Sequence, residues 1–160
     1  MILVTTGTNE QPFDRLVRAA AALDVGDDVV VQYGSSRAVV PRPGWVDFLP
    51  FDELAALARS SRVVVCHAGV GSIIMARRCG HRPIVVPRRH GLGEAVDDHQ
   101  VGLAGRLAQS GLVTLADDVD RLRLAVLDAR SEAGRGGVAG LPGADALAAD
   151  LRARMSRVAA

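Results

Sequence analysis

The chain has 160 residues, the size of one domain with a single core, and 49% of them are hydrophobic, enough to fill that core. Aromatic residues make up only 3% and the formal net charge is +1, which argues against a base-stacking platform and against general binding to nucleic acid or to an acidic membrane surface. All 19 basic residues are arginines, which excludes a lysine-containing phosphate loop and Schiff-base chemistry.

Short apolar segments alternate with segments of helical spacing along the first 133 residues. The pattern predicts strands at 2–6, 29–33, 45–49, 62–67, 83–87 and 112–115, and helices from Pro12 to Ala20 and at 51–60, 70–79, 97–109 and 118–129. Strands that are apolar throughout and separated by helices indicate a parallel sheet covered on both faces. We therefore expect a Rossmann-like, doubly wound α/β domain of about six strands over residues 1–133.

The C-terminal part follows a different pattern. Residues 134–143, "GRGGVAGLPG", are typical of a flexible linker, and 144–160 carry a helical pattern rich in Ala, Leu and Arg. Leu147, Leu151 and Met155 are four residues apart and form a narrow apolar stripe. The stripe suits docking on a partner, and packing back on the chain's own sheet remains the alternative.

The two cysteines, Cys66 and Cys79, lack CxxC spacing. We expect them to be small buried residues rather than a disulfide, which favours a reducing cytoplasm. The N-terminus "MILVTTGT" does not resemble a signal peptide, and no segment reaches the ~20 apolar residues that cross a bilayer.

The stretch "CHAGVGS" (66–72) joins the buried strand 62–67 to a helix. In an open α/β sheet, ligands bind beyond the carboxyl ends of the strands near the topological switch point, which this strand should flank. Gly69 and Gly71 would let backbone amides approach a ligand, and Ser72 adds a hydroxyl at the positive end of the helix, an arrangement that suits a diphosphate. The alternative is a tight turn with Ser72 as the cap. An NAD fingerprint would need glycine at position 74, which is Ile74.

A second polar cluster, "GEAVDDHQ", precedes the helix expected at 97–109. Asp97 and Gln100 have the spacing of a capping box. Asp98, His99 and Gln100 also fall at the carboxyl end of strand 83–87, beside the glycine turn, where they could bind sugar hydroxyls. One histidine without a second pair of ligands does not predict a metal site.

Three motifs together resemble the glycosyltransferase family 28 C-terminal domain: "TTGTNEQPFDRLVRA", "HAGVGSII" and "PIVVPRRHGLGEAVDDHQVGLA". They cover roughly residues 1–115 in the family's order. The likeness is closest to the small, separate donor-binding subunits, such as that of the dolichol-linked N-acetylglucosaminyltransferase and those of bacterial exopolysaccharide synthesis. The resemblance implies one half of a GT-B fold that binds a nucleotide sugar, usually a UDP-sugar.

The resemblance also implies roles for the matching residues. The diphosphate would lie between the "TTGT" loop and the "HAGVGS" turn, and Leu49 would meet the uracil edge with its backbone. His99 and Gln100 would contact the donor sugar or ribose. The implied substrate-binding residues are Thr6, Gly7, Thr8, Leu49, His67, Gly69, Gly71, Ser72, Asp98, His99 and Gln100.

Some positions are less typical of a donor site. Met75 stands where many members have a glutamate that holds the ribose hydroxyls, and Met75 cannot accept those bonds. Glu94 is the nearby acidic residue that could replace it. His67 is the candidate catalytic residue, with a packed structural histidine as the alternative. Arg88 and Arg89 are the arginines expected to meet a phosphate or a lipid-diphosphate acceptor.

A GT-B enzyme works in the cleft between two such domains, and this sequence accounts for one. We therefore expect the catalytic, donor-binding subunit of an inverting glycosyltransferase that acts with a membrane-attached, acceptor-binding partner on a lipid-linked or polysaccharide acceptor. It would be cytoplasmic, at the membrane through that partner, without a cofactor. The alternatives are a non-catalytic nucleotide-sugar-binding regulator or scaffold, and a nucleotide-free α/β interaction domain.

Overall fold

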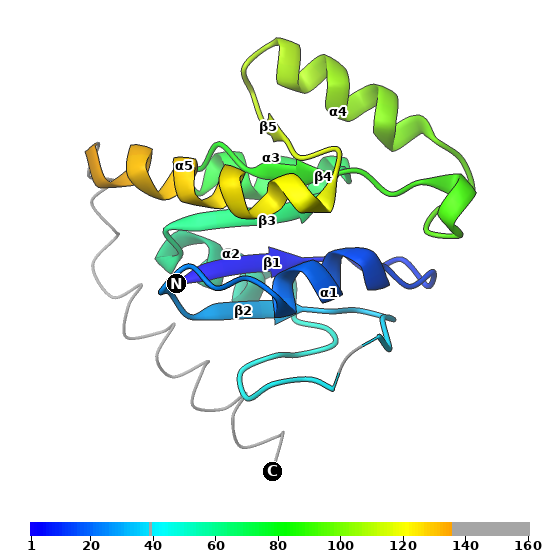
Figure 1. Ribbon diagram of the computed structural model, residues 1–160, viewed down its shortest axis with the longest axis horizontal. Coiled ribbons are helices and arrows are strands. Elements are labelled where there is room, and N and C mark those ends of the chain that lie inside the picture. The colour runs from blue at the N-terminus through cyan, green and yellow to red at the C-terminus, as the bar shows by residue number, and fades with distance from the viewer. Residues whose placement is uncertain (39, 136–160) are drawn as a thin grey trace.

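The computed structural model describes residues 1–38 and 40–135, which form a parallel sheet between two layers of helices (Figure 1). The sheet has the order β2-β1-β3-β4-β5. All its strands are parallel: β1 (Ile2–Thr5), β2 (Val29–Gln32), β3 (Val63–His67), β4 (Ile84–Val86) and β5 (Thr114–Leu115). The helices are α1 (Asp14–Ala21), α2 (Phe51–Ser60), α3 (Val70–Arg78), α4 (His99–Gln109) and α5 (Leu122–Arg135), with short 3₁₀ helices η1 (His90–Leu92) and η2 (Val119–Arg121).

Both faces of the sheet are covered, which confirms the doubly wound arrangement. Side chains alternate along each strand, so Val63 and Val65 pack on the layer that contains α1 and α5, whereas Val64 packs against α2 and α3. Cys66 faces the same side as Val64 and lies in a cluster with α4. The core is aliphatic apart from Phe13 and Trp45 on the first side, as the low aromatic content requires.

The expected strand at 45–49 is wrong, and the sheet has five strands rather than six. The segment makes a single parallel bridge, Gln32 to Val46, at the edge of the sheet. Prolines at 41, 43 and 50 flank it and keep it from extending into a ladder. Trp45 is buried, but Asp47 and Phe48 are exposed. The segment is therefore a loop anchored at one end.

The boundaries of three helices also differ from expectation. Helix α4 begins at His99 rather than at 97, and α5 begins at Leu122 rather than at 118. Helix α1 begins at Asp14 with Phe13 as its N-cap, two residues later than the predicted start at Pro12, and the Phe13 amide donates to the Ser36 hydroxyl at 2.9 Å. Helix α5 continues to Arg135, so the first two residues of the predicted linker are helical. The rest of the linker and the predicted C-terminal helix lie outside the described residues.

The cysteines are free thiols, with Cys66 buried and Cys79 partly buried. Burial raises the pKa of the Cys66 thiol to about 12, so it is an unreactive core residue. Over the described ranges, no helix combines the length and the apolar character that crossing a bilayer requires.

The switch point of the sheet lies between β1 and β3. From β1 the chain passes through α1 to β2 on one side, and it later returns to β3 on the other side. The turns that follow β1 and β3 therefore diverge and leave a crevice at the carboxyl edge of the sheet. The glycine turn lies at this edge, as predicted.

Candidate functional site

A pocket of about 360 Å³ opens at the carboxyl ends of β1, β2 and β3. It is lined by Gly7, Thr8, Gln32, Phe48, Leu49, Phe51, Leu54, His67, Gly71, Ser72 and Met75. Six of the predicted site residues meet here, from three segments far apart in the sequence. A larger pocket of about 750 Å³ between α1 and η2 contains none of the predicted site residues. The smaller pocket is therefore the candidate site.

The imidazole of His67 lies between two glycines, and this explains both of them. A Cβ atom on Gly69 would lie 2.1 Å from His67 Nε2, and one on Gly7 would lie 2.3 Å from His67 Cε1. Gly7 also has φ +78°, a left-handed conformation that favours glycine. Gly69 thus serves the packing of His67, whereas the sequence had suggested a direct approach of its amide to a ligand.

Gly71 and Ser72 form the wall of the pocket at the start of α3. The N-cap of α3 is Gly69, so Ser72 is not the cap. The first intrahelical bond runs from Ile73 N to Gly69 O, and the preceding amides have no acceptor within the helix. A Cβ atom on Gly71 would meet no described atom within 4 Å. Open space, free amides and the positive end of the helix dipole coincide at this wall.

His67 is neutral at physiological pH. Its burial, reinforced by the positive charge of Arg88, lowers its pKa to about 4. Its Nδ1 atom has no hydrogen-bond partner of good geometry among the described residues. A general base works best with a pKa near the operating pH, so His67 fits a neutral hydrogen-bonding role better than a basic one.

The other wall of the pocket is apolar and includes two phenylalanines that the sequence analysis missed. Phe48 is 48% exposed and Phe51 is 63% exposed, so both present aromatic surface to solvent, while Leu49 is partly buried between them. Exposed aromatic rings are typical stacking surfaces for flat ring systems. The signal was present in the composition, since the chain has only three phenylalanines and two of them line this pocket.

Gln32 is also a lining residue that the sequence analysis missed, although a polar residue at the end of the apolar strand "VVVQY" could have indicated it. It is 3% exposed and its amide bonds to the Gly7 turn and to the Asp47 carbonyl. Thr6 is 1% exposed and donates its hydroxyl to the Gln32 carbonyl at 3.2 Å, so it supports the turn from beneath the pocket.

The "DDHQ" segment does not line the pocket, and its predicted capping box is wrong. Asp98, not Asp97, is the N-cap of α4, and Asp98 accepts from the His90 amide at 2.8 Å. The Asp97 carboxylate bonds to the ring of exposed His99, which lowers the Asp97 pKa. Gln100 is buried and accepts from a backbone amide at 3.2 Å. Contacts of these side chains with a donor remain predictions. The described residues include no group of three metal-ligating side chains.

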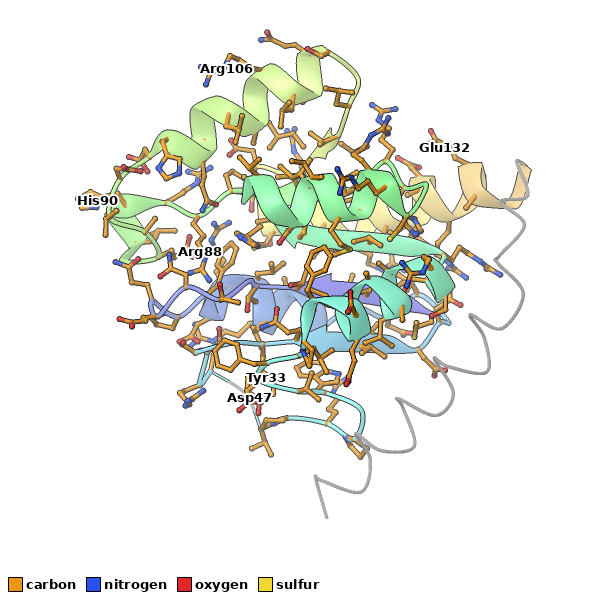
Figure 2. All side chains as sticks on the ribbon, turned by 180° about the vertical axis from the view of Figure 1, so that it is seen from behind. Tyr33, Asp47, Arg88, His90, Arg106 and Glu132 are labelled. Atoms are coloured by element: carbon orange, nitrogen blue, oxygen red, sulfur yellow. The ribbon has the colours of Figure 1, made fainter. Side chains whose placement is uncertain are left out.

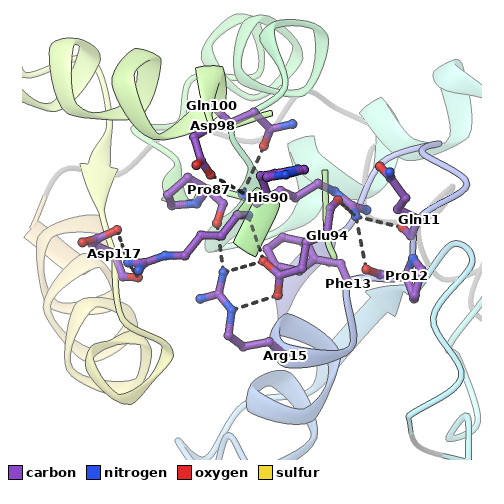
Figure 3. A network of polar contacts seen from close by, with 12 residues as sticks. Gln11, Pro12, Phe13, Arg15, Pro87, His90, Glu94, Asp98, Gln100 and Asp117 are labelled. Atoms are coloured by element: carbon purple, nitrogen blue, oxygen red, sulfur yellow. Dashed lines mark hydrogen bonds and ion pairs between the residues drawn. The ribbon is translucent and has the colours of Figure 1, made fainter. Parts of the chain in front are cut away.

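The expectation that Arg88 meets a phosphate is wrong (Figure 3), whereas a phosphate contact of Arg89 stays a prediction. Arg88 is 1% exposed, and Figure 2 shows it inside the molecule, whereas Arg106 lies at the surface. The Arg88 guanidinium donates to the carbonyls of Thr6, Gln11, Pro12 and Glu94 and lies over the Phe13 ring. Arg89 instead pairs with Asp117 at 2.7 Å on the surface.

Glu94 is engaged away from the pocket as well. It is 4% exposed, forms a bidentate ion pair with Arg15 at 2.9 Å, and accepts from the Arg89 amide. Glu94 therefore does not replace the missing ribose-binding glutamate. Met75 is 2% exposed and closes the apolar side of the pocket.

Several known proteins resemble this chain in sequence or in fold. Residues 1–135 match the model of the glycosyltransferase family 28 C-terminal domain. The chain is similar to the UDP-N-acetylglucosamine transferase subunit ALG13 of Yarrowia lipolytica, with 27% identity over 135 residues that cover 75% of this chain and 66% of the relative.

Two further proteins extend the comparison. One is the UDP-N-acetylglucosamine--N-acetylmuramyl-(pentapeptide) pyrophosphoryl-undecaprenol N-acetylglucosamine transferase of Syntrophotalea carbinolica, 33% identical over 87 residues, which cover 54% of this chain and 23% of that protein. The crystal structure of the glycotransferase of kitacinnamycin shares the fold, with a TM-score of 0.55 and 20% identity, over 99% of this chain and 42% of the other. The fold is one half of a GT-B glycosyltransferase, and the chain belongs to the glycosyltransferase family 28 C-terminal domain family.

Proposed function

We propose that this chain is the donor-binding catalytic subunit of an inverting glycosyltransferase, that its donor is a UDP-sugar, and that it transfers a hexose or N-acetylhexosamine to a lipid-linked or polysaccharide acceptor. A membrane-attached partner supplies the acceptor site and keeps the chain at the cytoplasmic side of the membrane. The observation that carries the proposal is the pocket that joins the β1 turn, the start of α3 and the Phe48–Leu49 segment.

The polar wall suits the leaving group of sugar transfer. Breaking the bond between the sugar and the nucleotide places negative charge on the diphosphate. The amides at Gly71 and Ser72 and the positive end of α3 are fixed before the reaction, so they stabilise that charge without reorganising. A neutral His67 can add one hydrogen bond from the same side.

The apolar wall suits the nucleoside. Phe48 and Phe51 offer aromatic surface for the base, and Leu49, to whose backbone the family resemblance assigns the uracil edge, lines the same wall. Met75 cannot bind the ribose diol, which favours the second candidate function, a non-catalytic nucleotide-sugar-binding scaffold. A transfer assay with the partner present separates the two functions.

The dependence on a partner is supported by the relatives. One relative is itself named a subunit, which supports a partner for this chain. The chain spans 66% of that relative, and 23% and 42% of the other two proteins. The second relative is named for an undecaprenol-linked acceptor, which supports a lipid-linked acceptor for this chain. Positioning two reactants can remove roughly 7–11 kcal/mol of a barrier, and a donor-binding half alone cannot position both.

The donor site is tested by thermal protection with UDP. We expect UDP to raise the Tm of the wild type and not that of Gly71→Val, because the branched side chain would fill the open space at this wall. Gly105→Val is the matched control, since Gly105 lies in α4, outside the pocket, and its Cβ direction is also open. Equal protection of a folded Gly71→Val would refute the diphosphate site.

Catalysis is tested by assaying the pure chain, the partner and their mixture, each with and without residues 143–160. We expect sugar transfer only by the mixture. Steady transfer by the pure chain would refute the dependence on a partner, and donor binding without transfer by the mixture would support the scaffold. Full activity of the truncated mixture would refute only the docking role of the C-terminal segment.

A further inference from the structure

We propose that Gln32 is a positioning residue that holds the two walls of the donor pocket in register, acting through the backbone and not by contact with the donor. The inference rests on the proposed function for the identity of the ligand. The arrangement itself is a property of the unliganded chain.

The amide of Gln32 makes four hydrogen bonds. Its Oε1 accepts from the Thr5 hydroxyl at 2.6 Å and from the Gly7 amide at 3.1 Å. Its Nε2 donates to the Gly7 carbonyl at 3.0 Å and to the Asp47 carbonyl at 2.6 Å. Two acceptor positions and two donors are all that a side-chain amide offers. Gln32 therefore has no hydrogen-bonding capacity left for a ligand, although it lines the pocket.

These bonds join segments that belong to different walls. Gly7 lies in the turn after β1, where it bonds through both its amide and its carbonyl and packs against His67. Asp47 immediately precedes Phe48 and Leu49 on the apolar wall. Gln32 sits at the end of β2, opposite Thr5 in the sheet register, and reaches both segments.

The Phe48–Leu49 segment of the apolar wall has few other attachments to the sheet. Beyond the single bridge between Gln32 and Val46, the Asp47 carbonyl also accepts from the Gly34 amide at 2.9 Å. The segment then leaves the edge of the sheet. A ligand whose two ends bind different walls requires those walls at a fixed separation, and errors of about 1 Å lower activity strongly. A buried amide that bonds both walls supplies that constraint.

The test compares a ligand that spans both walls with ligands that use one wall. UDP, uridine and pyrophosphate are titrated against the wild type, Gln32→Met and Gln32→Glu, with NMR to detect weak binding. We expect Gln32→Met to weaken UDP binding by about tenfold or more, the equivalent of at least one lost hydrogen bond, while uridine and pyrophosphate change by less than about threefold. Equal weakening of all three ligands, or unchanged UDP binding, would overturn the proposal.

Gln32→Glu gives a pH readout that general destabilisation would not produce. The new carboxylate would face the Gly7 and Asp47 carbonyls, and burial beside them raises its pKa. Above that pKa the side chain is a carboxylate and offers neither of the two N–H donors of Gln32. Below that pKa the protonated carboxyl group offers one O–H donor. The ratio of mutant to wild-type Kd for UDP should therefore fall as the pH decreases from 8 to 5.5, while the ratio for Gln32→Met stays flat. A flat ratio for Gln32→Glu would overturn the proposal.

Two controls separate the possible failures. Val126→Ala empties a buried position in α5, away from the pocket, and should lower the Tm without changing UDP affinity. Amide exchange at Gly7 and Phe48 is measured without ligand. Faster hydrogen exchange of both amides in Gln32→Met would support the positioning role. This readout does not depend on UDP binding, so a wild type that fails to bind UDP would refute only the proposed function. Unchanged exchange at both would overturn the positioning role.

Discussion

Gly69→Ala should destabilise the protein through one contact, the contact with His67. The backbone at Gly69 has φ −78° and ψ 130°, which any residue adopts, so the substitution introduces no backbone strain. The new methyl group would lie 2.1 Å from Nε2 and 2.8 Å from Cδ2 of His67. The ring cannot retreat, because a turn with Gly7 lies on its other side at contact distance.

The expected cost follows from two opposing effects. Overpacking of a rigid site costs about 1–3 kcal/mol, and the lower entropy of the unfolded chain returns about 0.4–1 kcal/mol. We expect a net loss of about 1–2 kcal/mol in the free energy of unfolding, measured by urea denaturation.

A second substitution isolates the cause. Adding His67→Ala to Gly69→Ala removes the ring from the path of the methyl group, so the double mutant should be more stable than the sum of the two single changes predicts, by about 1 kcal/mol or more. Gly71→Ala, whose methyl group meets open space, should not lower stability. Strict additivity of the Gly69 and His67 changes would refute the proposed packing.

Three further predictions concern the charges around the pocket. Met75→Glu should lower the Tm of the free protein, because the site is 2% exposed, yet tighten UDP binding by about 1–2 kcal/mol through the ribose hydroxyls; calorimetry that shows weaker or unchanged binding would refute the alignment at this position. The pKa of His67 is about 4 in the folded protein and has its ordinary value of 6.5 in the unfolded chain, so between pH 4 and pH 6.5 the unfolded chain binds more protons. Stability should therefore decrease as the pH falls from 6.5 to 4, by at most about 3 kcal/mol, and denaturation of His67→Gln should lack this component. Arg88→Met should cost about 3 kcal/mol or more, with little recovery in Arg88→Lys, because an ammonium group cannot reach four carbonyls that a planar guanidinium serves; a Lys variant with wild-type Tm would contradict this.

Much of the fold could be predicted because it depends on local pattern. Apolar runs such as "RVVVC" need burial on both sides, so a layer of helices must cover each face of the sheet. The topology of the sheet alone then places the glycine turn at the switch point. The pocket residues in the turn after β3 followed from that placement, and those in the turn after β1 followed from the family resemblance. The strand at 45–49 failed because three prolines and an edge position outweigh a short apolar pattern.

The polar contacts could not be predicted in the same way, because their partners come from distant segments. Arg88 was expected at the surface, where arginines usually lie. It is buried because the carbonyls of Thr6, Gln11 and Glu94 converge on it, and these carbonyls belong to two loops. Gln100 has the spacing of a cap, yet it turns toward the Arg88 backbone. The spacing of apolar residues along the sequence does not show which distant backbone groups will meet at one side chain.

The buried guanidinium of Arg88 also has a mechanical consequence. Through it, the turn after β1, the entrance to α1 and the loop after β4 are fastened at one interior point. Opening any one of them would expose a cation together with several unpaired carbonyls, so these parts move as a single body. Phe48, Leu49 and Phe51 lie on another side of the pocket, and the Arg88 guanidinium bonds to none of them. Substitution of these side chains, of which Phe48 and Phe51 are exposed, would therefore leave that body intact, and they are the place to begin altering which nucleotide the pocket accepts.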